Sequence, residues 1–80
     1  MIRFLVQELI SEKLFQEGVK LTVTQISEGT GISRVTLSKM LNHRGYNATT
    51  DNLDKLCQFF NCRIEDLIQY VPERDLNSSD

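Results

Sequence analysis

The sequence has two cysteines, one histidine and one proline among its 80 residues, and it has no tryptophan. The two cysteines, Cys57 and Cys62, are too few for a disulfide framework. Because His43 is the only histidine, there is no second pair of ligands for a zinc site. We therefore expect two reduced thiols in the core, which suits a reducing cytoplasm, and no metal or other cofactor.

Long apolar runs are also missing. Glu8 and Glu12 interrupt the apolar residues near the start, so we expect no signal peptide, and no stretch approaches the length of a transmembrane helix. A lone histidine without a nearby nucleophile or carboxylate gives no basis for catalysis, so we expect no enzyme. The length, with 40% hydrophobic and 25% charged residues, is typical of one soluble globular domain.

Acidic residues are absent from residues 29–50, although 11 occur elsewhere. The tail 73–80 carries three acids and one base, so it accounts for the whole net charge of −2. Within the acid-free segment, Arg34, Lys39 and Arg44 have no acidic neighbours in sequence. The distribution predicts a dipolar molecule with one basic face, despite the negative sum.

The spacing of apolar residues predicts a string of short helices. Ile2, Val6, Leu9 and Ile10 indicate a first amphipathic helix over about 4–16, which ends near Gly18. In the next segment Thr22 and Gln25 have the spacing of a capping box. A second helix is therefore expected from about Val23, with Ile26 facing the core.

A tight turn follows the second helix. Gly31 can take a positive φ and end that helix, and Ser33 can cap a third helix over about 34–42. Ser27 is small, which lets a neighbouring helix approach. The inward residues of the third helix are expected to be Leu37, Met40 and Leu41. Its outward residues are small, hydroxylic or basic, which is poor for packing and suited to the major groove of DNA.

The second half of the chain predicts two more helices. After a loop over 43–48, Thr49 or Thr50 caps a helix that ends at Asn61. Its buried stripe is expected to be Leu53, Leu56, Cys57 and Phe60. A short fifth helix over about 64–69 should bury Ile64, Leu67 and Ile68. Pro72 is expected to end the ordered domain, leaving 73–80 as a mobile acidic tail.

One strand possibility stays open, because residues 1–4 and 68–71 are able to pair as a small β-ribbon that joins the two ends. Leu5, Phe15, Phe59 and Tyr70 are expected to lie off the buried stripes. If several of them form one patch, they make a partner surface.

The segment from Thr22 to Leu67 resembles the lambda-repressor-like helix-turn-helix domain of the Cro/C1 type, the XRE family. The resemblance rests on Ser27, on the run Gly31-Ile32-Ser33-Arg34-Val35-Thr36-Leu37-Ser38-Lys39-Met40, and on Leu53–Cys62 followed by Glu65-Asp66-Leu67. It implies an all-α, compact five-helix DNA-binding domain over residues 1–72, with or without a small terminal ribbon.

The resemblance also implies roles for individual residues, because this family lays its third helix in the major groove. The residues implied to read bases are Arg34, Val35, Thr36, Ser38 and Lys39. The residues implied to bind phosphates are Thr24, Ser33, Asn42, Arg44, Tyr46 and Asn47. Arginine can contact guanine through two hydrogen bonds, and an apolar group can contact the thymine methyl.

The chain departs from the family pattern at three places. Val23 stands where the family usually has a glutamine that braces a phosphate, and Leu41-Asn42-His43 replaces a Glu-x-Gly sequence. The loop before the fourth helix is longer and carries Arg44, Tyr46 and Asn47. These changes suggest that phosphate binding has moved from the second helix to this loop.

The resemblance implies a sequence-specific transcriptional regulator that binds double-stranded DNA, and the lack of a separate effector domain favours a repressor. A homodimer on a palindromic operator is expected, although the sequence leaves its interface open. No membrane association or small-molecule ligand is evident. The alternative is an interaction module, such as an antitoxin that binds a partner protein. The acid-free segment argues against it, because such a module has no need to exclude acids there.

Overall fold

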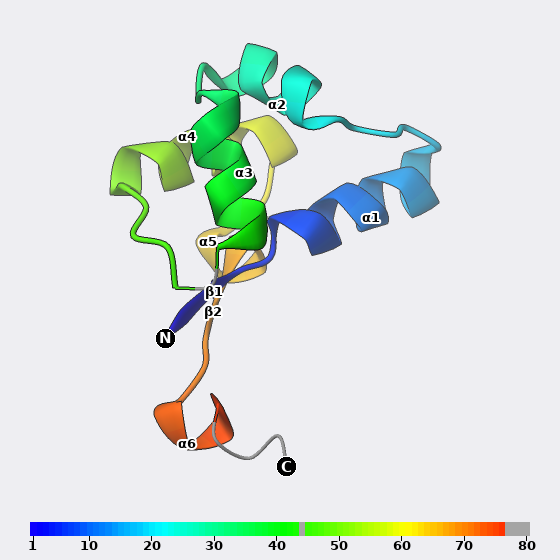
Figure 1. The fold of residues 1–80 in the computed structure, drawn as a ribbon. Coiled ribbons are helices and arrows are strands. Elements are labelled where there is room, and N and C mark those ends of the chain that lie inside the picture. Colours follow the sequence, from blue (N-terminus) through cyan, green and yellow to red (C-terminus); the bar gives the residue numbers. More distant parts are fainter. Residues whose placement is uncertain (44, 77–80) are drawn as a thin grey trace.

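The structure is a computed structural model that describes residues 1–43 and 45–76, with the side chains placed up to Arg74 (Figure 1). Five helices surround a small core, and a two-stranded ribbon joins the two ends of the chain. In chain order, the elements are β1 (Ile2–Phe4), α1 (Val6–Glu17), α2 (Val23–Thr30), α3 (Arg34–Asn42), α4 (Thr50–Phe60), α5 (Ile64–Leu67), β2 (Ile68–Tyr70) and α6 (Glu73–Leu76).

The predicted capping box at the start of α2 is confirmed. The backbone N–H of Gln25 donates to the Thr22 hydroxyl at 3.2 Å, and the Thr22 N–H donates to the Gln25 side chain at 2.9 Å. At the other end of α2, Gly31 adopts φ 81° and donates its N–H to the Ser27 carbonyl at 2.8 Å. A side chain is disfavoured at this φ, which explains the glycine.

The helices α3 and α4 begin with the same kind of cap. Ser33 accepts from the Thr36 N–H at 3.2 Å, as predicted. Of the two candidates at the start of α4, the structure selects Thr49, which accepts from the Asn52 N–H at 3.1 Å. Asn61 ends α4 in the left-handed conformation with φ 51°, so the predicted break is confirmed.

Every helix from α1 to α5 contributes to the core. The buried apolar residues of the described chain are Val6, Ile26, Ile32, Leu37, Met40, Leu56 and Leu67. The prediction that Ile64 is also buried is wrong, because its side chain is 45% exposed. The reason is that α5 is a single turn whose last residue, Leu67, fills the core, while its first residue lies at the edge.

The ribbon, which the sequence left open, is present. The strands β1 and β2 pair antiparallel with Ile2 opposite Tyr70 and Phe4 opposite Ile68. Just beyond them, the Met1 amino group donates to the Val71 carbonyl at 2.9 Å. The ribbon corrects two predicted helix limits, because strand pairing takes up 2–4 and 68–70. The first helix therefore begins at Val6 rather than near 4, and the fifth ends at Leu67 rather than 69.

The chain after Pro72 also differs from expectation. Glu73–Leu76 forms one turn of helix, α6, where a tail without structure was predicted. Figure 1 shows α6 beyond the ribbon and apart from the core helices. The rest of the predicted mobile tail, 77–80, lies outside the described residues.

The helices α2 and α4 pack closely at a glycine. A Cβ atom on Gly29 would lie 2.4 Å from Cε1 of Phe59, so only a hydrogen fits there. Phe59 and Leu5 are half-buried, and Phe59 packs against the core, which corrects their expected place away from the buried residues. By contrast, Phe15 and Tyr70 are 85% and 68% exposed, as predicted.

Candidate nucleic-acid interface

The turn between α2 and α3 is three residues long, Gly31 to Ser33. Its middle residue, Ile32, is held both by packing of its side chain and by hydrogen bonds of its backbone. The Ile32 side chain is 3% exposed and belongs to the core. Its carbonyl accepts from the Ser27 hydroxyl at 2.6 Å, and its N–H donates to the Thr30 hydroxyl at 3.1 Å. The turn is therefore held by side chains of α2, and α3 begins directly after it.

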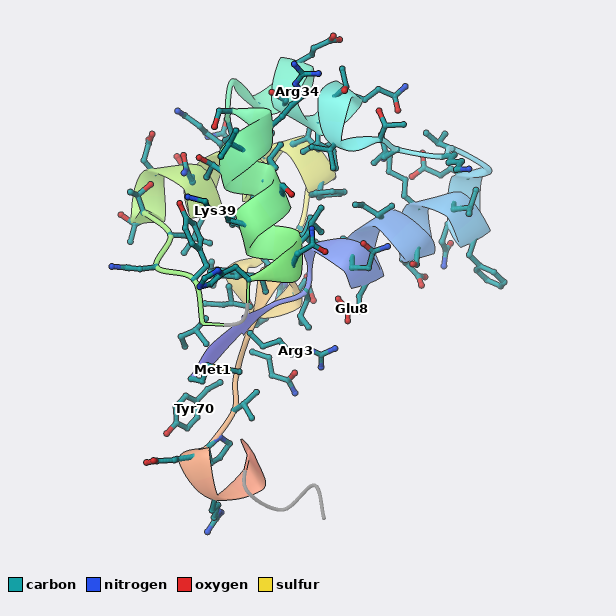
Figure 2. The ribbon with its side chains drawn as sticks, in the orientation of Figure 1. Met1, Arg3, Glu8, Arg34, Lys39 and Tyr70 are labelled. Atoms are coloured by element: carbon teal, nitrogen blue, oxygen red, sulfur yellow. The ribbon has the colours of Figure 1, made fainter. Side chains whose placement is uncertain are left out.

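Four predicted base-reading residues form one exposed face of α3. At about 100° per residue, Arg34, Val35, Ser38 and Lys39 lie within an arc of about 140°. The buried Leu37 and Met40 lie on the opposite side. All four are exposed, and Val35 is exposed by 66% although it is apolar. Figure 2 shows Arg34 near the α2 end of α3 and Lys39 farther along the helix.

Thr36 differs from the other four predicted readers. It is half-buried, and its hydroxyl accepts from the Ser33 hydroxyl at 2.9 Å while its N–H donates to the same oxygen. Both residues therefore belong to the cap of α3. Base contact by Thr36 and phosphate contact by Ser33 remain predictions, and a Ser33 that binds phosphate would do so from the cap.

Neither Arg34 nor Lys39 has an ion-pair partner among the described residues. Other cations of the described chain are paired: Arg3 with Glu8, Lys13 with Glu17 and Lys55 with Asp51. The first turns of α2 and α3 also carry no acid. The cations on α3 are thus not neutralised by the described residues, which leaves a positive surface for an anionic partner.

The predicted phosphate-binding residues lie in varied settings. Thr24 is exposed in the first turn of α2, where backbone N–H groups favour an anion. Asn42 is exposed at the end of α3, and its amide donates to the Ser38 carbonyl at 3.0 Å. Val23 is half-buried and packs against the core, so it contributes no polar group where the family usually has glutamine.

In the loop after α3, only some of the predicted phosphate-binding side chains are exposed to solvent. Asn47 is exposed, whereas Tyr46 is half-buried and packs against the core, with its ring edge-on to His43 at 6.1 Å between centroids. The sequence therefore missed a packing role for Tyr46. Arg44 lies outside the described residues. Phosphate binding by these three loop residues remains a prediction.

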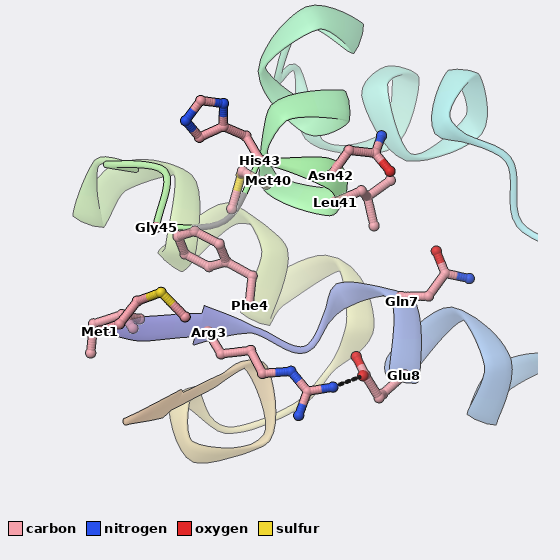
Figure 3. Close-up of a pocket in the computed structure, with 11 residues that line it drawn as sticks. Met1, Arg3, Phe4, Gln7, Glu8, Met40, Leu41, Asn42, His43 and Gly45 are labelled. Carbon is pink, nitrogen blue, oxygen red and sulfur yellow. Dashed lines mark hydrogen bonds and ion pairs between the residues drawn. The ribbon is translucent and has the colours of Figure 1, made fainter. Parts of the chain in front are cut away.

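A hollow of about 210 Å³ lies between β1 and the end of α3 (Figure 3). Phe4, Met40 and His43 line it, and the ion pair between Arg3 and Glu8, at 2.7 Å, lies at its lower side in the view. Sequence reasoning did not find this feature, because it depends on how the ribbon packs against α3.

Among the described residues, no three His, Cys, Asp or Glu side chains gather as a possible metal site. In the part of the chain that the structure describes, every helix is too short or too polar to cross a membrane.

The family model for the Cro/C1-type helix-turn-helix DNA-binding domain matches residues 12–73. The chain belongs to this family. The match begins within α1, at residue 12, and runs through α5 and β2. It includes the capped pair α2–α3, so α2 and α3 are the helices of the helix-turn-helix motif. Membership implies DNA binding, and the family is typically non-enzymatic. No curated protein matches the chain significantly.

Proposed function

We propose that this Cro/C1-type protein is a sequence-specific transcriptional regulator that acts as a repressor in the cytoplasm. Its α3 helix enters the major groove of double-stranded DNA, where Arg34, Val35, Ser38 and Lys39 contact base edges. The observation that carries the proposal is the outward face of α3, whose two cations have no acidic partner in the described chain.

The first experiment is selection of binding sites from random duplex DNA by the full chain. We expect enrichment of one palindromic sequence that the protein binds at least ~10³-fold more tightly than random DNA. An unenriched pool would contradict sequence-specific recognition. Repression is then measured with a reporter promoter that carries the selected site, and an unchanged or raised reporter level would contradict a repressor.

Alanine variants separate base contact from phosphate contact. Arg34→Ala and Lys39→Ala should each lose ~1–3 kcal/mol of discrimination at particular operator positions. Arg44→Ala should instead weaken binding to every sequence and reduce the salt dependence by about one unit. Equal losses for operator and random DNA in the Arg34 and Arg44 variants would contradict this division of roles.

The palindromic operator requires a homodimer, for which the ribbon offers an exposed pair of large, uncharged side chains. Ile2 and Tyr70 are neighbours across the two strands and are 43% and 68% exposed, and β2 carries no charge. Tyr70→Ser should therefore shift sedimentation toward the monomer, while Phe15→Ser, at a more exposed aromatic on α1, serves as the control. A dimer retained only in Tyr70→Ser would place the interface at α1 instead.

The second candidate is the interaction module. Leu14 and Phe15, in the last turn of α1, and Val19, just after it, are 48%, 85% and 39% exposed, which favours contact with another protein. A module of this kind would bind a partner protein through these residues and show no preferred DNA sequence. The site-selection experiment therefore distinguishes the two functions.

A further inference from the structure

Two hydroxyls of α2, those of Ser27 and Thr30, hold the turn through hydrogen bonds to Ile32. Thr30 donates its hydroxyl hydrogen to the Ile26 carbonyl at 2.7 Å and accepts from the Ile32 N–H at 3.1 Å. Ser27 donates to the Ile32 carbonyl at 2.6 Å. Both backbone polar groups of Ile32 are thus bonded to side chains of the preceding helix. Neither hydroxyl faces solvent freely, because both residues are half-buried.

Ile32 lies between the residue that ends α2 and the residue that caps α3. Gly31 before it is in the left-handed conformation, and Ser33 after it caps α3. The Ile32 side chain fills the core at 3% exposure. Its side chain is packed in the core, and its backbone N–H and carbonyl are both hydrogen-bonded. Ile32 therefore has little freedom to rotate, so the first turn of α3 should keep one orientation relative to α2.

We infer that Ser27 and Thr30 are positioning residues for base recognition, because they fix the orientation of α3 through the Ile32 backbone. The inference rests on the proposed sequence-specific function. Neither residue needs to contact DNA for this role. Their hydroxyls act through Ile32 on the first turn of α3, which carries Arg34 and Val35.

A change in the orientation of α3 affects base contacts and phosphate contacts unequally. Hydrogen bonds to base edges weaken steeply when distance or angle departs from the favoured range. Attraction between cations and phosphates depends weakly on orientation and supplies most of the affinity for random DNA. Loss of the two hydroxyls should therefore reduce discrimination between operator and random DNA more than it reduces binding to random DNA.

The variants remove each hydroxyl with little change of shape. Thr30→Val keeps the branched side chain, and Ser27→Ala is the independent second variant if one of them folds poorly. Thr30→Ser restores the hydroxyl and provides the rescue. Ser11→Ala is the matched control, because Ser11 is an exposed hydroxyl residue on α1, outside the motif.

The measurement is the ratio of dissociation constants for random DNA and for the selected operator, at a temperature where the melting curve shows each variant folded. We expect Thr30→Val and Ser27→Ala to lower this ratio about five- to tenfold, the equivalent of the one net hydrogen bond to Ile32 that each variant removes. Affinity for random DNA should stay within about twofold. Thr30→Ser and Ser11→Ala should match the original chain.

Amide hydrogen exchange gives a second readout that does not involve DNA. The Ile32 amide should exchange faster in Thr30→Val than in the original chain, and Thr30→Ser should restore protection. If the ratio is unchanged in both hydroxyl-less variants, or if both affinities fall together, the positioning role is overturned while sequence-specific binding stands. If the original chain selects no operator, the proposed function fails and this inference fails with it.

Discussion

The helices α1 and α4 pair lysine and acidic side chains within the same helix, whereas the cations of α3 form no ion pair in the described chain. On α1, Lys13 pairs with Glu17 at 3.2 Å, and on α4, Lys55 pairs with Asp51 at 3.0 Å. Both pairs join residues four apart on one helix. On α3, the cations Arg34 and Lys39 have no ion-pair partner in the described chain. The same kinds of side chain thus serve their own helix in one region and remain available for a partner in another.

The free energies involved explain why this difference costs the fold little. An exposed ion pair at this spacing contributes about 0.3–0.5 kcal/mol, so leaving α3 without such pairs hardly affects folding. A single side-chain contact to a base is worth about 1–3 kcal/mol of discrimination. A cation on α3 therefore contributes more free energy as a base contact than as part of an ion pair. The helix itself is stabilised by the Ser33 cap and by the buried Leu37 and Met40.

The strongest test of the comparison is charge reversal on each kind of helix. Arg34→Glu should weaken operator binding by about 100-fold or more, because it removes a base contact and places an acid beside phosphates. Lys13→Glu, the control on α1, should change binding less than about threefold. Fluorescence titration measures both. Equal losses would show that general charge, rather than the α3 face, governs binding.

The second test concerns a thiol beside α4. Burial raises the pKa of the Cys62 thiol to about 11, and the Cys57 sulfur and the Asp66 carboxylate act in the same direction. Because the thiolate is the reactive form, Cys62 should alkylate roughly 100-fold more slowly at pH 7.5 than an ordinary thiol. Its rate should rise with pH until about 11.

The alkylation rate is followed by mass spectrometry in a Cys57→Ser variant, which isolates Cys62. Removing Cys57 also removes its contribution to the pKa, so the midpoint should fall somewhat below that of the full chain. The same variant unfolded in urea is the control and should titrate near the ordinary thiol value. A fast reaction at neutral pH in the folded variant would contradict the effect of burial.

The third test asks whether the stability of the fold can be lowered without changing DNA recognition by α3. Gly29→Ala should destabilise the fold by about 1–3 kcal/mol, because the new methyl group collides with the Phe59 ring. Urea unfolding measures the loss, and DNA discrimination should be unchanged where the variant is folded. In a Phe59→Leu background the same substitution should cost less. An equal cost in both backgrounds would show that the ring is not the obstacle.

The smallest effect is expected from the acidic end of the chain. Deleting 73–80 removes a net charge of −2 that competes weakly with phosphate for the basic face. We expect DNA binding at low salt to tighten about twofold, the difference to vanish at high salt, and the melting temperature to stay nearly unchanged. A large fall in melting temperature would instead show that this segment packs, for example across a dimer.

The sequence predicted the local features of the fold because each lies within a few residues of its partner. The Thr22–Gln25 capping box, the left-handed Gly31 and the Ser33 cap all follow from patterns no longer than one helical turn. The exposed face of α3 follows from the helical period in the same way. Its predicted contacts with DNA are not tested by the fold.

Features that depend on distant residues were missed or left open. The strands of the ribbon are far apart in sequence, as the bond between Met1 and Val71 next to them shows, because these residues are 70 positions apart. No pattern within a few residues therefore predicts either strand. The half-buried place of Phe59 depends on the approach of α2 at Gly29. The Tyr46 ring packs against the core although its loop reads as polar.

The amino-acid sequence by itself thus determined the helix-turn-helix pair and the acid-free surface of α3, because caps, helical period and the absence of acids are properties of short segments. Only the tertiary structure decided which residues at the helix ends form strands and which aromatic side chains are half-buried. It also decided that the Ser27 and Thr30 hydroxyls form hydrogen bonds with the Ile32 backbone. The physical reason is that burial and side-chain hydrogen bonds depend on which segments meet, and a local pattern does not specify that meeting.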